Sequence, residues 1–433
     1  MFRRLDIFGW KFYQAWALFY HDMIYSSLMS CVPLFSLYLH IPFCRHRCAY
    51  CDFNTYAGLA DLIPAYGEAL CREIDRFRRQ PALPVHTIYL GGGTPSLLPQ
   101  ETLAQIFQAI QATFALQASA EISMEANPGT VTLPYLRDLR RLGVNRLSLG
   151  MQTAHPAELR LLERQHDYPD VIRAVRWARQ AGFDNLSLDL IFGIPGQTLQ
   201  SWQWSLELAL GLAPEHLSLY SLTIEPGTPL ARWEGRGLLP ALEADLALDL
   251  AADMYELASE RLEAAGYAQY EISNWARQQP TAPPALTPAF ACRHNLQYWR
   301  NQPYLGLGAG AHGYAGGLRL ANVLRPQEYI RRLAQTPLVE QPFPLSPANE
   351  TITPIERQAE MGETMMMGLR LALEGVSDAA FRARFGQGLR EVYASPIEYL
   401  VGVGLLEWAA GGDLLRLTRR GYLLGNVVFR EFI

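Results

Sequence analysis

The sequence lacks the features of several large classes of protein. Lysine and arginine number 37 against 42 aspartate and glutamate residues, which gives a net charge of −5, and no stretch is rich in basic residues. The positive surface that nucleic-acid binding requires is therefore missing, and we expect no nucleic-acid partner. Cysteine is also scarce, with six among 433 residues.

Three of the six cysteines, Cys31, Cys71 and Cys292, are scattered along the chain. So few cysteines in a chain of this length do not form the framework of a disulfide-stapled secreted protein. We therefore expect reduced thiols and a cytoplasmic location. A chain of 433 residues is too long for one ordinary domain and fits a large barrel with an appended domain.

The other three cysteines, Cys44, Cys48 and Cys51, form a CxxxCxxC motif directly after the apolar, strand-like run 34–41. Three thiolates can hold three irons of a 4Fe-4S cluster and leave the fourth iron open to a ligand that is not protein. A zinc site or a chance grouping is the alternative. Zinc sites usually pair CxxC motifs, and no second pair follows, so the spacing favours a cluster.

Two further stretches make a resemblance specific: Tyr38-Leu39-His40-Ile41-Pro42-Phe43-Cys44 before the motif, and Gly91-Gly92-Gly93-Thr94-Pro95 after it. From about residue 35 to its end, the chain resembles the radical S-adenosylmethionine (SAM) superfamily. Within that superfamily it resembles the oxygen-independent coproporphyrinogen III oxidase family, which includes a HemW-type haem-chaperone branch. The resemblance implies a 4Fe-4S cluster whose open iron binds SAM, and whose electron cleaves SAM to a deoxyadenosyl radical.

Helical patterns alternate six times with short apolar runs. This alternation predicts an α/β fold with a parallel sheet and helices outside it. The resemblance implies a partial, TIM-like (β/α)6 radical SAM barrel, whose site lies at the carboxyl ends of the strands. The predicted strands are 35–40, 87–90, 121–125, 146–149, 185–191 and 216–222, and the predicted helices are 64–79, 100–114, 133–142, 168–181, 199–212 and 242–265.

The domain limits follow from changes in pattern. We expect the barrel over 34–275, a connecting region over 276–354, and a small, mainly helical, winged-helix-like domain over 355–433. Residues 1–33 form an aromatic-rich extension whose longest uncharged stretch is too short to span a bilayer. This extension is either an interfacial amphipathic helix or translated sequence upstream of a start at Met29, and we favour the second interpretation.

Several residues are candidates for binding SAM. The glycines of the 91–95 motif follow a strand, where the lack of a Cβ lets the backbone approach a ligand. Asp189 lies inside an apolar strand, and burying its carboxylate is costly unless something pairs with it; a salt bridge to Arg164 is the structural alternative. By resemblance, the SAM contacts are Tyr38, Tyr50, Gly92, Gly93, Thr94, Glu125, Gln152, Arg164 and Asp189, with packing against the cluster as the alternative for the two tyrosines.

Two positions separate the oxidases from the chaperones. Residue 53 is Phe, where the oxidases have a further cysteine. The sequence His294-Asn295-Leu296-Gln297-Tyr298-Trp299 resembles the HNxxYW motif of the chaperones, which implies haem binding by His294, Tyr298 and Trp299. Imidazole can ligate haem iron and aromatic rings can pack on a porphyrin. A hydrogen-bonded core histidine is the alternative, and His312, within a glycine-rich stretch, is a rival ligand.

We therefore predict a haem chaperone that binds a 4Fe-4S cluster, SAM and haem and delivers haem to haem-requiring respiratory proteins, membrane-bound ones included. The alternatives are oxygen-independent coproporphyrinogen III oxidase, an oxidoreductase of porphyrin biosynthesis, and a radical SAM enzyme with another substrate. The sequence leaves open the client proteins, a homodimer, a position at the membrane surface and whether SAM is cleaved.

Overall fold

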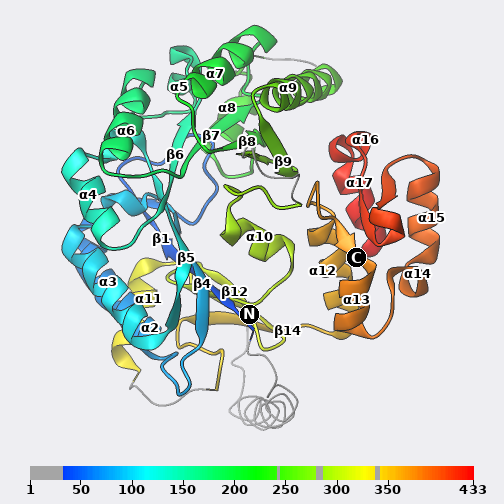
Figure 1. The fold of residues 1–433 in the computed structure, drawn as a ribbon. Helices are drawn as coiled ribbons and strands as arrows, with labels where there is room; N and C mark the ends of the chain where they lie inside the picture. The colour runs from blue at the N-terminus through cyan, green and yellow to red at the C-terminus, as the bar shows by residue number, and fades with distance from the viewer. Residues whose placement is uncertain (1–32, 241–243, 279–285, 337–341) are drawn as a thin grey trace.

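A computed structural model describes residues 33–240, 244–278, 286–336 and 342–433. All but the last residue of the predicted N-terminal extension, including Met29, lie outside the described residues. The main feature of the described chain is a curved twelve-stranded sheet with helices along its convex side (Figure 1). The order of the strands is β14-β13-β12-β11-β1-β4-β5-β6-β7-β8-β10-β9, and β14 does not pair with β9, so the barrel is open.

Six neighbouring strands are parallel and form the barrel proper. Each overlaps one of the six predicted strands, and helices alternate with them, which confirms the predicted fold class. The strands are β1 (Phe35–Ile41), β4 (Pro84–Gly92), β5 (Ala115–Ala126), β6 (Arg146–Gln152), β7 (Leu186–Phe192) and β8 (His216–Ser221). The helices are α2 (Ile63–Asp75), α3 (Gln100–Thr113), α4 (Leu133–Arg141), α5 (Pro156–Leu161), α6 (Tyr168–Gln180), α7 (Leu199–Gly211), α8 (Pro229–Glu234) and α9 (Ala244–Ala264).

Local sequence sets the helix ends. The Asp167 side chain accepts from the backbone N–H of Asp170, whose own carboxylate accepts from the N–H of Asp167, a reciprocal pair that starts α6. Thr198 and Ser201 start α7 in the same way. Because Gly182 follows α6 with φ of +90°, it takes the left-handed turn that most side chains disfavour.

The segment 276–354, predicted to be a connecting region, adds four strands to the same sheet. Its strand β11 (Tyr304–Leu307) pairs in parallel with β1, and β12 (His312–Ala315), β13 (Leu318–Asn322) and β14 (Asn349–Pro354) continue outward as antiparallel strands. At the other edge lie β10 (Asn274–Arg277) and β9 (Tyr267–Glu271). The segment also contains α10 (Arg293–Trp299) and α11 (Pro326–Gln335).

The barrel strands alternate between two environments. Leu37, Leu39 and Ile41 of β1 join the apolar core shared with the outer helices, whereas their neighbours on the other face are polar or aromatic. Successive strand residues point to opposite faces, so the second set faces the interior, which we call the lumen. The lumen residues of the six strands are Ser36, Tyr38, His40, Thr87, Tyr89, Glu121, Ser123, Glu125, Arg146, Ser148, Ser187, Asp189, His216, Ser218 and Tyr220.

The C-terminal segment has its own apolar core, which includes Met361, Met365 and Phe429. It is mainly helical but also contains a three-stranded sheet, β15-β17-β16, that the sequence pattern did not reveal. In Figure 1 it lies beside β9 and α10. Its elements are α12 (Arg357–Gly368), β15 (Val376–Ser377), α13 (Asp378–Phe385), α14 (Leu389–Val392), α15 (Ala394–Gly402), β16 (Leu406–Ala409), β17 (Leu414–Leu417), α16 (Arg419–Leu423) and α17 (Gly425–Phe429).

Candidate cluster and cofactor site

The cysteine motif forms a loop just beyond the carboxyl end of β1. It begins with β2 (Phe43–Cys44), which pairs with β3 (Tyr56–Ala57). Backbone bonds hold the middle of the loop: the N–H of Ala49 donates to the carbonyl of Leu162 at 3.1 Å. The thiols of Cys44, Cys48 and Cys51 are free and partly exposed, so all three can take a ligand.

Each of the three thiols has a polar neighbour. The hydroxyl of Thr94 donates to Cys44 Sγ at 3.5 Å, and Arg164 Nη1 donates to Cys48 Sγ at 3.4 Å. Cys51 Sγ lies 3.6 Å from the hydroxyl of Thr55. Hydrogen bonds of this kind orient metal ligands and tune the metal they bind. In the described part of the chain no three His, Cys, Asp or Glu side chains are placed to hold one metal ion; in a cluster, each thiolate would bind a different iron.

Asn127, which we did not predict as a site residue, joins two of these neighbours. Its amide nitrogen donates to the hydroxyl of Thr94 at 3.1 Å, and its amide oxygen accepts from Arg164 Nη2 at 2.6 Å. Arg164 also donates to the carbonyl of Gly150 at 2.9 Å. A continuous chain of hydrogen bonds therefore connects Cys44 to Cys48. No sequence signal identified Asn127 beyond its place two residues after Glu125.

Burial raises the pKa of the Cys44 thiol in the cluster loop, although the hydrogen bond from Thr94 acts in the opposite direction. Burial also raises the pKa of Tyr50, which packs near Leu162. For Arg164, burial lowers the pKa, but the neighbouring Tyr50 and Cys48 outweigh it and the net shift is upward. The guanidinium therefore stays charged beside the thiols.

The glycines at the end of β4 allow the chain to approach itself closely. A Cβ on Gly93 would lie 2.7 Å from the carbonyl oxygen of Ile41 and 2.8 Å from that of Phe43. Gly92 has φ of +106°, and a Cβ there would collide with the ring of His40. The backbone N–H of Thr94 donates to the carbonyl of Phe43 at 2.8 Å. The motif thus docks the end of β4 onto the cluster loop.

Glu125 is the lumen carboxyl nearest this glycine motif in the hydrogen-bond network. Its carboxyl accepts from the hydroxyl of Tyr89 at 2.8 Å and from the backbone N–H of Gly92 at 3.1 Å. Burial raises the pKa of Glu125 to about 7, and the hydrogen bond from Tyr89 opposes that shift while the charge of Asp189 adds to it. Glu125 is therefore close to half-protonated at neutral pH.

We expect the raised pKa of Glu125 to make the free energy of unfolding depend on pH. Because this pKa is higher in the folded chain than the ordinary 4.5, protonated Glu125 adds its full contribution to the unfolding free energy below pH 4.5, and this contribution is lost as the pH rises to about 7. In Glu125→Gln that loss is absent, so between those pH values the wild type should lose on the order of 3 kcal/mol more unfolding free energy than the variant. Urea titrations of cluster-free protein at both pH values measure the difference; equal losses would contradict the raised pKa.

Two strained residues lie close to the cluster loop. Gln152, at the end of β6, has φ of +63°, and Glu163, which precedes Arg164, has φ of +55°. Residues other than glycine seldom adopt these angles, and such strain concentrates at functional sites. A Cβ on Gly150 would lie 2.7 Å from the amide nitrogen of Gln152, so this turn is also tightly packed.

Asp189 is stabilised by hydroxyl groups. Its carboxylate accepts from Ser148 at 2.9 and 3.0 Å and from Ser187 at 3.3 Å. Burial raises its pKa, and the hydrogen bond from Ser148 opposes the shift. The alternative of a salt bridge to Arg164 is wrong, because that guanidinium points instead to Cys48, Asn127 and Gly150.

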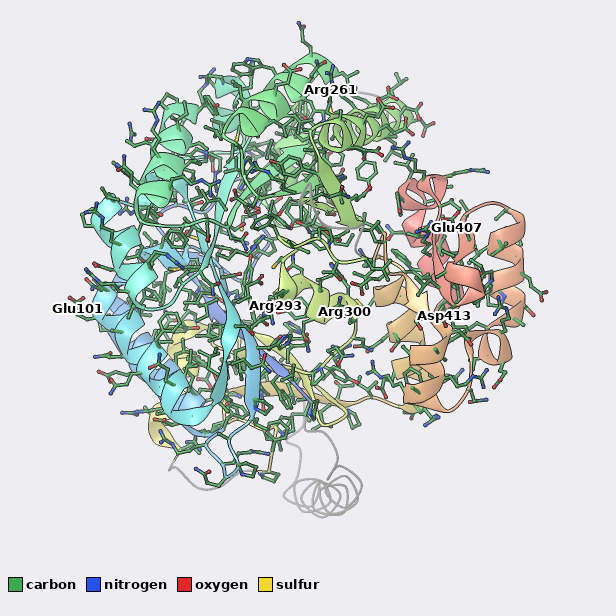
Figure 2. All side chains as sticks on the ribbon, in the orientation of Figure 1. Glu101, Arg261, Arg293, Arg300, Glu407 and Asp413 are labelled. Carbon is green, nitrogen blue, oxygen red and sulfur yellow. The ribbon has the colours of Figure 1, made fainter. Side chains whose placement is uncertain are left out.

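His294 lies inside the barrel, on α10, between the sheet and the C-terminal segment; Figure 2 labels Arg293 and Arg300 on either side of it in sequence. Its side chain is 1% exposed. Nδ1 lies 2.9 Å from the hydroxyl of Thr87, and Nε2 lies 2.9 Å from the hydroxyl of Tyr298. Burial lowers the pKa of His294 to about 3. This geometry fits the hydrogen-bonded core histidine that the sequence left open.

Three other residues predicted to bind haem or SAM lie in different places, one inside the lumen, one at the C-terminal segment and one at the surface. Tyr38 stacks on Tyr89 in the lumen, with ring centroids 6.3 Å apart, and lies 6.5 Å from the ring of His294. Trp299 packs under the guanidinium of Arg370, 5.3 Å from the ring centroid, at the C-terminal segment. His312, at the start of β12, is exposed. The structure therefore does not bring His294, Trp299 and His312 together around one open surface.

Comparisons with known proteins agree with this architecture. Residues 38–209 match the family model of the radical SAM superfamily, and residues 355–424 match that of the HemN C-terminal domain. The chain is 39% identical over 402 residues to "Heme chaperone HemW" of Bacillus subtilis, covering 92% of this chain and 99% of that protein. It is 38% identical over 403 residues to the protein of that name from Mycobacterium tuberculosis, covering 92% and 95%.

Among solved structures, the chain resembles the coproporphyrinogen III oxidase HemN of Escherichia coli, described as a radical SAM enzyme. The TM-score is 0.75, and the match covers 92% of this chain and 90% of that one. The sequence identity is 23%, so this likeness establishes the fold alone.

Proposed function

The chain belongs to the heme chaperone HemW family of radical SAM proteins, and we propose that it binds a 4Fe-4S cluster, SAM and haem and delivers haem to haem-requiring proteins. The cluster is supported by the loop in which three free thiols each have a polar neighbour. The delivery of haem is supported by membership of the family.

The donor set of the loop fits a cluster with one open iron. Cys44, Cys48 and Cys51 would hold three irons, and when bound the cluster would supply an iron that accepts SAM and an electron that can cleave it. Arg164 keeps its positive charge and donates a hydrogen bond to the sulfur of Cys48, which would orient this ligand. The carboxyl of Glu125, beside the glycine motif, would contact SAM when SAM is bound.

The proposed clients are haem-requiring respiratory proteins, including membrane-bound ones, which a cytoplasmic chaperone would meet at the membrane surface. None of the helices within the described ranges is long and apolar enough to cross a membrane. A homodimer is a further part of the proposal, and light scattering at several protein concentrations would test it.

His294 is the proposed haem ligand, and because it is buried, haem can bind to it only after a local change in structure. The imidazole must leave its hydrogen bonds with Thr87 and Tyr298 before either nitrogen can reach iron, so α10 must shift when haem binds. His312 is already exposed and needs no such movement. The two histidines therefore give different expectations for the same titration.

We expect His294→Ala to weaken haem binding by about tenfold or more, since loss of a ligand should cost at least as much as loss of its neighbours. Haem is titrated into anaerobically reconstituted protein, and the Soret band reports both affinity and axial ligation. His312→Ala is the matched control and should bind like the wild type. The reverse pattern, with loss only in His312→Ala, would move the ligand to β12.

The enzyme alternative is tested on the same samples. Phe53 stands where the oxidases have a further cysteine, and its side chain is 63% exposed beside the cluster loop. Coproporphyrinogen is supplied under strictly anaerobic conditions with SAM and a reductant, and protoporphyrinogen is measured. Turnover that survives His294→Ala but is lost when Cys48 is replaced would replace the chaperone with an oxidase.

A further inference from the structure

Arg146 is a buried cation without a hydrogen-bond or ion-pair partner in the described ranges. Burial lowers its pKa, but neighbouring groups, Cys292 and Glu121 first among them, outweigh burial and the net shift is upward. Arg146 is the first residue of β6, points into the lumen, and is 2% exposed. Its Nε is buried without a hydrogen-bond partner, and no residue in the described ranges forms a hydrogen bond or an ion pair with its guanidinium. A buried charge normally has a partner, because leaving it unpaired is costly.

The carboxylate best placed to pair with Arg146 is already occupied. Glu121, on the adjacent strand β5, accepts from the backbone N–H groups of Arg293 and His294 at 3.1 and 3.2 Å. It therefore caps the start of α10 and forms no close ion pair with the guanidinium, although its charge helps to raise the pKa of Arg146. Cys292, Tyr270 and Tyr89 also raise the pKa of Arg146. Burial raises the pKa of each of these three groups in turn.

The charge of Arg146 extends toward the cofactor end of the lumen. Burial raises the pKa of Glu125 and of Asp189, the two lumen carboxyls that we propose for SAM, and the charge of Arg146 opposes both shifts. Ser148, two residues after Arg146 on β6, and Ser187, on the adjacent strand β7, both already donate to Asp189. At the carboxyl end of β8, Tyr220 points to the same side and is 45% exposed, so solvent reaches the lumen there.

From these observations we propose that Arg146 binds a carboxylate of the ligand that enters the lumen, and that this carboxylate is a propionate of haem. The inference rests on the proposed function. A guanidinium presents paired donors that match the two oxygens of a carboxylate. The methionyl group of SAM carries the same chemical group and is the other source, but in the proposed site that carboxylate binds the open iron.

Haem dimethyl ester provides the test, because its esterified propionates carry no charge. We expect the wild type to bind haem about 10–100-fold more tightly than the diester, as loss of hydrogen bonds to a charged group would cause. Arg146→Met should bind both compounds with the same affinity. Arg146→Lys keeps the charge without the paired donors and should retain part of the preference. An equal preference in wild type and Arg146→Met would overturn the inference.

SAM binding to the reconstituted cluster separates the two sources. It should be the same in wild type and Arg146→Met; a loss of SAM affinity with an unchanged preference for haem would assign Arg146 to the SAM carboxylate and overturn the propionate assignment. Wild type that binds neither haem nor its diester would refute the proposed function, and the SAM titration alone would then decide what Arg146 binds.

Discussion

Replacing Cys48 by alanine is expected to remove the iron–sulfur cluster from the protein. Only three cysteines are available in the loop, so each must bind one iron, and the variant would have two thiolates left. Loss of a hydrogen-bonding neighbour of a metal ligand typically costs about 10–100-fold in metal affinity, and loss of the ligand itself should cost more. Thr94→Val, which removes only the hydroxyl that donates to Cys44, should fall between wild type and Cys48→Ala.

Iron and sulfide content after anaerobic reconstitution measure this effect, together with the charge-transfer absorbance of the cluster. Cys71→Ala is the matched control: Cys71 is also free and partly buried, but it lies on α2, outside the loop. It should keep the full cluster. A complete cluster in Cys48→Ala would show that the three-thiol assignment is wrong, and zinc in place of iron in the wild type would restore the alternative that the sequence left open.

The barrel was predictable because its information is local. The periodicity of the six apolar runs and the turn glycines located the six strands and the six long helices, although β5 begins at Ala115, well before the predicted strand, and the short helices α5 and α8 were not predicted. The pairing of β11 with β1 could not be predicted from the sequence, because it joins Tyr304 to Ser36 across most of the chain and leaves no local pattern. Proline-containing stretches on either side of the short strands β12 and β13 also made the segment look like a connection.

Some residues of the site could be predicted from local sequence and others could not. The cysteines share one motif, so the sequence identified them together, whereas Asn127 and Arg164 come from different parts of the barrel and meet only in the fold. The lumen did have a signal that we did not use: Ser36, Tyr38 and His40 alternate with apolar residues in β1. Read with the same period, β6 would have singled out its buried arginine.

The second large effect is expected far from the cluster, at Glu73 of α2. Glu73 lies on the buried stripe of this helix with Tyr66, Leu70 and Ile74, and its side chain is fully buried. A carboxylate on an otherwise apolar stripe predicts a polar partner, but the sequence could not say which one.

Four donors from strand β13, helix α11 and two loops of the added segment converge on the Glu73 carboxylate. They are the backbone N–H of Gly308 at 2.8 Å, the hydroxyl of Tyr329 at 2.7 Å, the hydroxyl of Ser346 at 2.8 Å and the amide of Asn322 at 3.0 Å. Burial raises the pKa of Glu73, and these hydrogen bonds oppose the shift. The carboxylate thus fastens the added strands β11–β13 and helix α11 to the barrel.

Glu73→Ala is therefore expected to lower the free energy of unfolding by about 4–6 kcal/mol, because each buried donor left without an acceptor costs about 1–3 kcal/mol. Glu73→Gln keeps one acceptor oxygen but turns the other into a donor that faces two donors, so it should lose about half as much. Glu68→Ala, an exposed change on the same helix, should stay within about 0.5 kcal/mol of wild type. Urea unfolding of the cluster-free protein measures all three. If Glu73→Ala were as stable as Glu68→Ala, water or a shift of α2 would have to satisfy the four donors, and the added strands would be held to β1 by their backbone pairing alone.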